Sequence, residues 1–408
     1  MKDIILITNF WHFDNEKNSS RYSAMSDIIV EHGYNLEVLT SDFYHRTKTK
    51  REYDNDFLAS FDYKITLLDE PIYKKNVSIR RLLSHKRFAK NVIKYLKQRK
   101  QPDAIIVVIP STYVAKYVIE FCHKNGIKTI LDIQDLWPEA FKMAINIPIV
   151  SSMLFLPMQR MANYAYKHAT EIVAVSKTYV ERAESVRNEK GKGTAIYLGS
   201  DYDNALSAIA SIAVNKPESE FWITYIGALG VSYNIKLVID AISKLEEEGI
   251  NNIVFNIFGN GVAENNFKEY AELKHINAQF FGHTEYGQMM AYLSKTDIAV
   301  NPIIGTSVSS VINKVCDYAT AGTVVVNDQN SPEYRKMLEE YDCGINCRNN
   351  DVVSFSEAIK KLYYDKELRE RMRNNAKVMA EENFNRGKTY LKIIDILDSV
   401  CGGKNAKR

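Results

Sequence analysis

Residues 301–326 (NPIIGTSVSSVINKVCDYATAGTVVV) contain side chains suited to binding a phosphorylated ligand. Ser309 and Ser310 lie near the predicted start of a helix, where hydroxyl groups and free backbone N–H groups can bind an anion. Lys314 can neutralise phosphate charge, and Asp317, about one turn further along, can accept hydrogen bonds from ribose hydroxyls. An N-cap followed by an exposed i,i+3 ion pair is the alternative interpretation.

Two glycine-rich turns precede this segment. Gly227 and Gly230 follow a predicted strand and precede a helix, and Gly259 and Gly261 end another buried strand. Glycine lets a diphosphate approach the backbone, and a helix N-terminus supplies free N–H groups and a favourable dipole. Ligands gather at the carboxyl ends of strands in an open α/β sheet, so we expect both turns to face one site. The Gly-x-Gly-x-x-Gly spacing is absent, and ordinary strand-to-helix turns remain an alternative.

The first half of the chain holds a second group of polar candidates. Ser19 and Ser20 precede a predicted helix and can cap it, while Arg21 in its first turn can reach a phosphate. A pure capping role fits this segment as well.

The segment DIQDLWPEAF, residues 132–141, follows another predicted buried strand. Its carboxylates, Asp135 and Glu139 among them, can orient a sugar hydroxyl or act as a base, and Trp137 can stack on the apolar face of a sugar. Alternatively, Asp135 caps a turn and Trp137 lies in the core.

The elements that position these residues follow an alternating pattern. Short runs rich in Ile, Val and Leu alternate with longer amphipathic segments, which is typical of parallel strands covered on both faces by crossover helices. We therefore expect an α/β fold with two doubly wound halves. The strands are predicted at residues 4–8, 36–40, 65–68, 104–109, 129–133, 171–175, 195–198, 222–226, 253–258, 278–281, 298–301, 323–326 and 344–346.

The length of 408 residues predicts two or three domains. Residues 199–220 lose the strand–helix alternation and contain turn formers, so the connection is placed there. The predicted parts are an N-terminal domain at 1–200, a C-terminal domain at 201–382, and a final helix and tail at 383–408.

Composition excludes several classes of protein. The chain is 46% hydrophobic and 25% charged with only 9 Pro and 18 Gly, which excludes a disordered or collagen-like chain. The net charge of +3 is too balanced to indicate nucleic-acid binding, and the five scattered cysteines fit a reducing cytosol better than a disulfide framework or zinc site. The longest apolar runs fall short of the roughly 18 residues that a membrane-spanning helix needs.

A strongly basic segment nevertheless lies in the first half. Residues 74–100 contain eleven Lys and Arg residues and no Asp or Glu, with apolar residues near helical spacing. Such an amphipathic helix can rest on anionic lipid, and the apolar residues 145–158 are long enough to enter a membrane interface but too short to span it. A solvated helix face and an ordinary core segment are the alternatives. The basic segment contains no recognisable nucleic-acid-binding module.

Several motifs in order resemble glycosyltransferase family 4. In the second half, GALG, FGNG, FFGHTEYGQMMAYLSKTDIAVNP and NKVCDYATAG resemble that family's nucleotide-sugar domain. The first half adds residues 8–43, DIQDLWPEAF, IVAVSKTYVERA and IYLGSD, each in the place where the family would have it. The resemblance implies a GT-B fold, in which two Rossmann-like domains face a central cleft and the C-terminal helix packs back on the first domain. It is strongest to bacterial enzymes that build capsule, O-antigen or other surface polysaccharides.

The chain departs from the family pattern at several positions. The family usually has two glutamates separated by seven residues, where this chain has Ser309 and Asp317. The Arg and Lys that often follow the first glycine of the GALG turn are replaced by Ala228 and Asn234, which makes Lys314 the better cationic candidate.

The resemblance assigns provisional roles to these residues. Asp135 and Ser309 are the catalytic candidates. The donor-binding candidates are Gly227, Gly230, Gly259, Ser310, Val311, Lys314 and Asp317, and the candidates that face the acceptor or the phosphates are Ser19, Ser20, Arg21, Trp137 and Glu139. No metal or other cofactor is expected, because helix dipoles and basic side chains would stabilise the departing diphosphate.

The expected activity is transfer of a sugar, with retention of configuration, from a UDP-sugar or another nucleotide-diphosphate sugar. The expected acceptor is a lipid-linked or growing glycan, and the expected location is the inner face of the cell membrane. A nucleotide-sugar epimerase on the same fold and a catalytically silent sugar-nucleotide-binding partner are the alternatives. Nucleic acid is not an expected partner.

Overall fold

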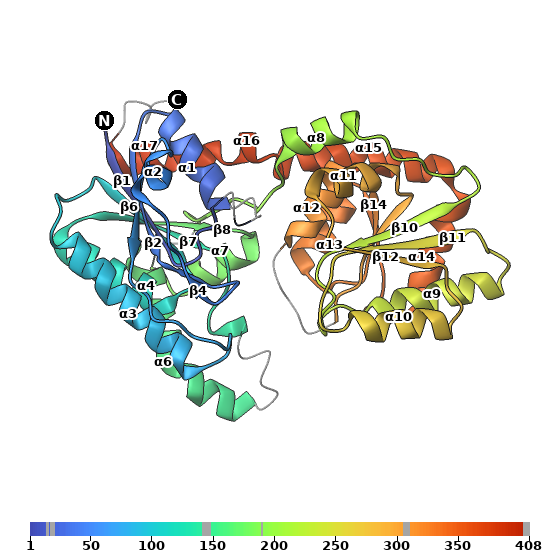
Figure 1. Ribbon diagram of the computed structural model, residues 1–408, viewed down its shortest axis with the longest axis horizontal. Coiled ribbons are helices and arrows are strands. Elements are labelled where there is room, and N and C mark those ends of the chain that lie inside the picture. Colours follow the sequence, from blue (N-terminus) through green and yellow to red (C-terminus); the bar gives the residue numbers. More distant parts are fainter. Residues whose placement is uncertain (14–15, 17–20, 141–147, 189–190, 305–310, 403–408) are drawn as a thin grey trace. The chain divides into compact units, whose positions relative to one another are not determined.

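The computed structural model describes residues 1–13, 16, 21–140, 148–188, 191–304 and 311–402 (Figure 1). The chain forms two compact units. Unit 1 consists of residues 1–196 together with the chain from Tyr390 onwards, and unit 2 consists of Tyr197–Thr389. The chain thus enters unit 2 four residues before the predicted boundary at residue 200, and returns to unit 1 at Tyr390.

Unit 1 is built on a parallel sheet of seven strands in the order β5-β2-β1-β6-β7-β8-β9. In the centre of the sheet, Ile4 pairs with Leu36 on one side and with Ala104 on the other. The strands are β1 (Asp3–Thr8), β2 (Asn35–Ser41), β5 (Lys64–Leu68), β6 (Ala104–Ile109), β7 (Lys128–Ile133), β8 (Glu171–Ala174) and β9 (Thr194–Ala195). A short antiparallel hairpin is formed by β3 (Phe43–Tyr44) and β4 (Thr49–Lys50).

Helices cover both faces of this sheet (Figure 1). Every residue of β6 is buried, as expected for a parallel strand between two helical layers. The helices are α1 (Arg21–Glu31), α2 (Asn55–Ala59), α3 (Ile79–Leu96), α4 (Thr112–Asn125), α6 (Pro148–His168), α7 (Lys177–Glu184) and α17 (Leu391–Cys401). Helix α17 packs against α1 and β6, so the C-terminal helix returns to the first unit as expected.

Unit 2 repeats the architecture with a parallel sheet of six strands in the order β12-β11-β10-β13-β14-β15. The strands are β10 (Phe221–Ile226), β11 (Ile253–Phe258), β12 (Ala278–Gly282), β13 (Ile298–Asn301), β14 (Val324–Asn327) and β15 (Gly344–Asn346). The helices are α8 (Tyr202–Ser211), α9 (Ile235–Glu247), α10 (Glu264–Leu273), α11 (Tyr286–Lys295), α12 (Asn313–Thr320), α13 (Pro332–Glu340), α14 (Val352–Tyr364), α15 (Lys366–Asn383) and α16 (Arg386–Thr389).

The α/β fold with two parallel sheets confirms the prediction from the alternating pattern. Helix α8 occupies part of the segment that was expected to be an irregular connection. Only one of its residues, Ala205, is fully buried, so the segment lacks the strong apolar stripe by which a helix is recognised in a sequence. Within the described ranges, no helix is long and apolar enough to cross a lipid bilayer. All five cysteines are free thiols.

Candidate functional site

The two glycine-rich turns of unit 2 lie in direct contact at the carboxyl ends of β10 and β11. The backbone N–H of Gly227 donates to the carbonyl of Phe258 at 2.9 Å, and Leu229 donates to Asn260 at 2.9 Å. A Cβ atom at Gly259 would lie 2.0 Å from the Gly227 carbonyl oxygen, so no larger residue fits there. The glycine of the second turn is therefore needed for the close approach of the two backbones.

Lys314 of α12 brings a cation to the first of these turns. Its side chain is buried, and Nζ lies 4.0 Å from the ring centroid of Tyr225 and 3.9 Å from that of Tyr233. Within the described part of the chain, Nζ has no hydrogen-bond partner, and burial lowers the pKa of Lys314 well below its usual value. A Cβ on Gly227 would be 3.0 Å from Nζ. A buried ammonium without a partner is costly, and an anion at the Gly227 turn would compensate it.

Asp317 lies one turn further along the same helix and has different neighbours. Its Oδ1 accepts a hydrogen bond from the hydroxyl of Tyr286 at 2.9 Å. Burial raises the pKa of Asp317 to about 7, although the Tyr286 hydrogen bond and the charge of Arg386 oppose that shift. Lys314 points to Gly227 instead of Asp317, so the alternative of an exposed i,i+3 ion pair is wrong.

The remaining donor-side candidates differ in what the structure describes. Ser309 and Ser310 lie outside the described residues, and α12 begins at Asn313. The side chain of Val311 is fully buried in the apolar core of unit 2. A Cβ at Gly230 would meet nothing within 4 Å, so this glycine faces open space.

The neutral residues that replace the family's basic pair make local contacts. Asn234 caps α9, with its Oδ1 accepting from the Leu237 N–H at 3.2 Å, and its Nδ2 donates to Asn350 at 2.7 Å. The carbonyl of Ala228 accepts a hydrogen bond from the Tyr225 hydroxyl at 2.8 Å. The basic group at the Gly227 turn is therefore Lys314, which belongs to α12. The helix that follows this turn, α9, has the neutral Asn234 at its N-cap.

In unit 1, Arg21 forms a buried ion pair. Its Nε lies 3.1 Å from Oδ2 of Asp132, its Nη2 donates to Oδ1 at 3.2 Å, and its Nη1 donates to the carbonyl of Ile196 at 2.8 Å. The guanidinium also lies 5.0 Å from the ring centroid of Tyr390. These contacts hold Arg21 inside unit 1. Ser19 and Ser20, predicted beside it, lie outside the described residues.

The segment after β7 places Asp135 and Trp137 together. The indole Nε1 of Trp137 donates to Oδ2 of Asp135 at 3.2 Å, and burial raises the pKa of this partly exposed carboxyl group. Trp137 is only 4% exposed, which agrees with its alternative placement in the core. Glu139 pairs with Arg182 of α7, whose Nε lies 2.6 Å from Glu139 Oε1.

Two residues of α3 that sequence reasoning did not single out as site residues lie against Trp137. The guanidinium carbon of Arg81 is 4.6 Å from the Trp137 ring centroid, and the His85 ring lies 5.8 Å from it at an interplanar angle of 14°. Arg81 is one of the eleven basic residues of the segment predicted to be an amphipathic helix, and its side chain is buried. The spacing of positions 81, 85, 88 and 92 places both residues on the buried face with Phe88 and Val92, and this periodicity was the available signal.

The described residues contain no group of three or more His, Cys, Asp or Glu side chains positioned to hold a metal ion. The expectation that no metal takes part remains a prediction.

Comparison with known proteins relates this geometry to a family. Residues 209–379 match the family model "Glycosyl transferases group 1". The matched residues lie within unit 2. The matched segment contains the two glycine-rich turns together with Lys314 and Asp317. No curated protein sequence matches the chain.

Solved structures extend the likeness in fold to nearly the whole chain. Sucrose-phosphate synthase from Thermosynechococcus elongatus has a TM-score of 0.71 at 12% identity, covering 98% of this chain and 100% of that one. WaaG, a glycosyltransferase involved in lipopolysaccharide biosynthesis, has a TM-score of 0.66 at 13% identity, and Anabaena HepE in complex with UDP has 0.65 at 14%; each covers 98% of this chain and 100% of its own. These likenesses confirm an α/β fold with two Rossmann-like domains, as in GT-B glycosyltransferases.

Proposed function

We propose that this chain is a glycosyltransferase that takes a sugar from a nucleotide-diphosphate sugar, in particular a UDP-sugar. The observation that carries the proposal is the buried ammonium of Lys314, unpartnered among the described residues, beside the Gly227 turn in the segment that matches glycosyl transferases group 1. In this proposal, Lys314 binds the diphosphate and Asp317 accepts hydrogen bonds from the ribose hydroxyls. Anabaena HepE, which shares the fold, has been solved with UDP and with UDP-glucose.

The proposed reaction forms a bond between an acceptor hydroxyl oxygen and the anomeric carbon of the donor sugar. The bond between that carbon and the diphosphate oxygen breaks, and the leaving diphosphate accepts the hydroxyl proton. Lys314 stabilises the negative charge that develops on the diphosphate in the transition state, and this electrostatic effect is its proposed contribution to the rate. Asp135, at the carboxyl end of β7, is the proposed sugar contact in unit 1. Retention of configuration is proposed on the resemblance to family 4.

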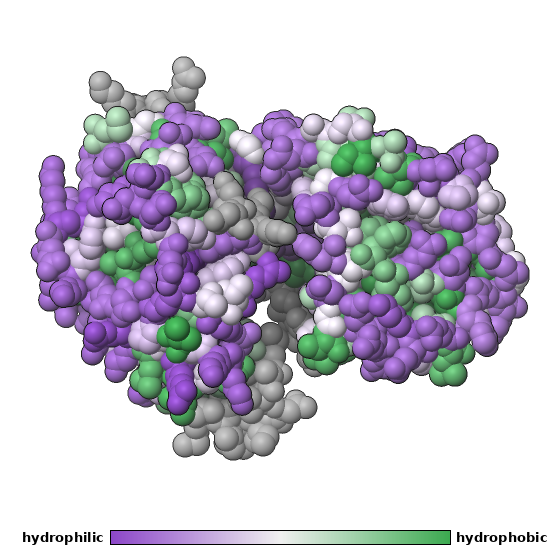
Figure 2. All heavy atoms as spheres, viewed as in Figure 1, coloured by the Kyte–Doolittle hydropathy of each residue, from purple (hydrophilic) through white to green (hydrophobic). Residues whose placement is uncertain are grey.

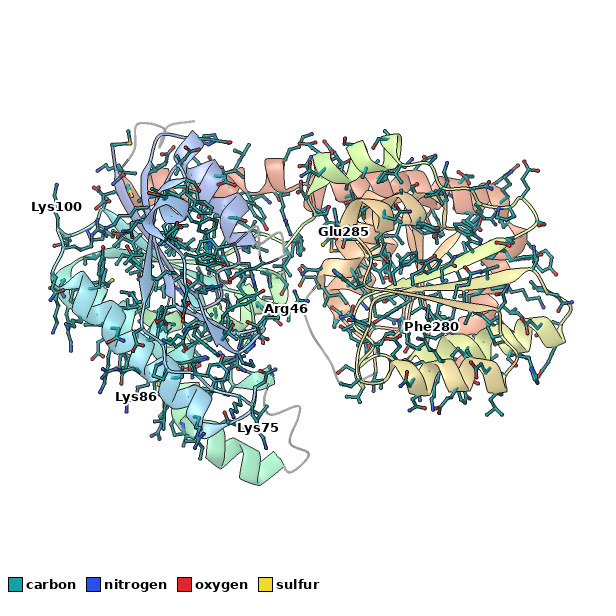
Figure 3. All side chains as sticks on the ribbon, in the orientation of Figure 1. Arg46, Lys75, Lys86, Lys100, Phe280 and Glu285 are labelled. Atoms are coloured by element: carbon teal, nitrogen blue, oxygen red, sulfur yellow. The ribbon has the colours of Figure 1, made fainter. Side chains whose placement is uncertain are left out.

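The acceptor is proposed to be a lipid-linked or growing glycan in bacterial surface polysaccharide synthesis. The surface of unit 1 around the start of α3 supports a membrane location, because Ile72, Val77, Ile79 and Leu83 are large apolar residues that are each at least half exposed. Basic residues lie along the same helix: Lys75 and Lys86 lie near the lower end of α3, and Lys100 lies near its opposite end (Figure 3). Apolar side chains docked in an interface and basic ones facing anionic lipid headgroups are the two usual sources of peripheral membrane binding.

Lysine residues also lie on the neighbouring helix α4, where Lys116 and Lys124 both pair with Glu120. A cavity of about 730 Å³ lies beside the two helices, and Lys97, Lys116 and Lys124 are among the residues that line it. Figure 2 shows hydrophilic side chains over α3 interrupted by apolar ones at its lower end. We propose that this side of unit 1 docks on anionic lipid on the inner face of the membrane.

Calorimetry with UDP, and with a panel of other nucleoside diphosphates, tests the donor site. Lys314→Met keeps the length of the side chain and removes its charge, and should weaken UDP binding by about 10- to 100-fold, the value of one charge-assisted hydrogen bond. Lys336→Met, at an exposed lysine of the same unit, is the matched control and should bind UDP as the wild type does. Equal affinity in the wild type and in Lys314→Met would contradict the proposal.

Product analysis by NMR distinguishes the alternative activities. A glycosyltransferase releases the nucleoside diphosphate and joins the sugar to an acceptor, or slowly to water. An epimerase converts the donor sugar with the nucleotide still attached. Donor binding without any turnover across a panel of acceptors would instead favour a catalytically silent binding partner.

A further inference from the structure

Unit 1 contains a cluster of buried polar atoms without hydrogen-bond partners among the described residues. They are Oδ1 of Asn9, Nε of Arg81, and both ring nitrogens of His85. Asn9 is 4% exposed, Arg81 8% and His85 0%. Buried polar atoms in folded proteins nearly always have partners, so a group of four in one place indicates that a ligand or water completes the site.

The cluster lies where the carboxyl ends of β1, β5 and β7 meet α3. Glu70, which follows β5, joins two of its members: its Oε2 accepts from Asn9 Nδ2 at 3.0 Å, and its Oε1 is 3.8 Å from His85 Nε2. Trp137 lies against both Arg81 and His85. The carboxyl edge of a parallel sheet is where ligands of open α/β folds bind.

Arg81 brings a buried positive charge to the cluster, with the carboxyl groups of Glu70 and Asp135 in its neighbourhood but not in direct contact with it. Its guanidinium carbon lies 4.6 Å, 5.8 Å and 5.9 Å from the ring centroids of Trp137, Tyr73 and Phe10. Its Nη1 donates to the carbonyl of Asn76 at 2.8 Å, and no carboxylate among the described residues forms an ion pair with it. Aromatic faces attract a buried cation but do not neutralise its charge, so the guanidinium would be stabilised further by an anion.

Glu70 acts on the charge of Arg81 but forms no ion pair with it among the described residues. Glu70 already accepts hydrogen bonds from Asn9 and from Ser84 Oγ at 3.1 Å. Burial raises the pKa of Glu70, so this carboxyl group binds a proton more readily than an exposed carboxyl group does. Burial also lowers the pKa of His85 well below its usual value, so the ring is neutral near pH 7 with one nitrogen as donor and one as acceptor.

We propose that Arg81, His85 and Asn9 form a binding site for an acceptor that carries an oxyanion, phosphate or carboxylate, next to hydroxyl groups. Arg81 binds the oxyanion through its charge and its Nε–H. His85 donates one further hydrogen bond, and its other nitrogen and Asn9 Oδ1 each accept from a different hydroxyl group of the acceptor. The assignment of this ligand as the acceptor rests on the proposed function, whereas the anion site itself rests only on the cluster.

Titration of the full-length protein with small anions tests the site. The background variant is Lys314→Met, which removes the proposed phosphate contact of unit 2. Inorganic phosphate and glucuronate are the two anionic probes, and glucose is the neutral control, with binding followed by thermal shift. Both anions should raise Tm in a concentration-dependent way, while glucose at equal concentration should have little effect. Stabilisation by phosphate alone identifies a phosphorylated acceptor, and stabilisation by glucuronate alone an acidic sugar.

Matched variants localise the effect. Adding Arg81→Gln should weaken anion binding by about tenfold or more, because a charge-assisted contact is lost. Arg80→Gln changes the exposed neighbour on the same helix and should leave binding unchanged. If Arg81→Gln does not fold, as judged by circular dichroism, Arg81→Lys keeps the charge without the planar guanidinium and should still weaken binding. Equal anion affinity with and without the Arg81 change, or no anion binding at all, would overturn the proposal and leave water as the occupant.

UDP binding separates this proposal from the previous one. Arg81→Gln alone should bind UDP with wild-type affinity, because its effect is confined to unit 1. A loss of UDP binding would show that the effect is not local, and would contradict the anion site. If Lys314→Met leaves UDP binding intact while Arg81→Gln abolishes anion binding, the donor assignment fails and the anion site stands.

Discussion

The ammonium group of Lys314 lies directly against Gly227, so that a Cβ atom on this glycine would be only 3.0 Å from Nζ. The two residues belong to different elements, α12 and the turn after β10, and their contact fixes the position of the cation at the turn. Gly227 also has a φ of 127°, a conformation that residues with a side chain rarely adopt.

Gly227→Ala should therefore displace Lys314 and strain the backbone. We expect a loss of about 1–3 kcal/mol in the free energy of unfolding, together with weaker UDP binding. Urea unfolding and calorimetry measure the two effects. Gly230→Ala is the control from the same turn, since its Cβ would meet nothing within 4 Å, and it should unfold like the wild type. Wild-type stability in Gly227→Ala would contradict the described contact.

UDP binding should depend on pH through Asp317. Burial raises the pKa of this carboxyl group to about 7, and only the ionised form accepts hydrogen bonds from two ribose hydroxyls with both oxygens. Affinity should therefore rise between about pH 6 and pH 8. Calorimetry at several pH values measures this trend, which Asp317→Asn should flatten. An unchanged pH profile in Asp317→Asn would assign the trend to another group.

The same carboxyl group should affect stability in the opposite direction. Because the pKa of Asp317 is higher in the folded state than in the unfolded state, its contribution is fully present below about pH 4 and is lost as the pH rises through about 7. Asp317→Asn, which is neutral at every pH, should gain stability relative to the wild type over that interval. We expect about 1–2 kcal/mol, allowing for the partial exposure of the carboxyl group. Urea unfolding at pH 5 and pH 8 measures the difference.

The Arg21–Asp132 pair should be important for the stability of unit 1. Arg21→Met leaves the fully buried carboxylate of Asp132 without its cationic partner, although Gln134 still donates a hydrogen bond to it, and should reduce the free energy of unfolding by about 3–5 kcal/mol. Arg21→Met/Asp132→Leu removes both charges and should recover part of the loss. If Arg21 instead bound a phosphate group of a substrate, Arg21→Met would weaken anion binding with little loss of stability. Denaturant unfolding and phosphate titration of the variants decide between these roles.

Anionic vesicles should bind the surface of unit 1 around the start of α3. Co-sedimentation with phosphatidylglycerol vesicles at low salt is expected, and high salt should weaken it. Leu83→Glu, at a 58% exposed position of α3, should reduce the bound fraction severalfold without unfolding the protein. Leu273→Glu, at a 72% exposed position of unit 2, is the control and should bind as the wild type does. Absence of binding at low salt would contradict the membrane location.

The arrangement of strands could be predicted from the sequence because buried parallel strands appear as continuous apolar runs. The runs at 104–109 and 253–258 coincide with β6 and β11. The hairpin of β3 and β4 could not be predicted in this way, since each of its strands has only two residues. In the same way, Lys314 and Asp317 could be selected by type and spacing, but their separate partners, Tyr225 and Tyr286, come from other elements.

In helix α3, the buried and exposed residues differ from those expected from the sequence. Its apolar residues were expected to form one face and its basic residues the other. In the first half of the helix, however, Arg81, Ser84 and His85 are buried, while Ile79 and Leu83 are exposed. Periodicity identifies the two faces of a helix, but it does not determine which face meets the core when the core itself is polar.

In the first half of α3, the exposed side is apolar and the buried side is polar. The residues proposed to enter the lipid and those proposed to bind an anion project from opposite sides of one helix, whose thickness with side chains is about 10 Å. A rigid element, rather than a loop, would then set the height of the anion site above the bilayer. Under these two proposals, an acceptor would bind only if its charged group lies at a particular distance from the lipid surface. The thickness of α3 would set that distance.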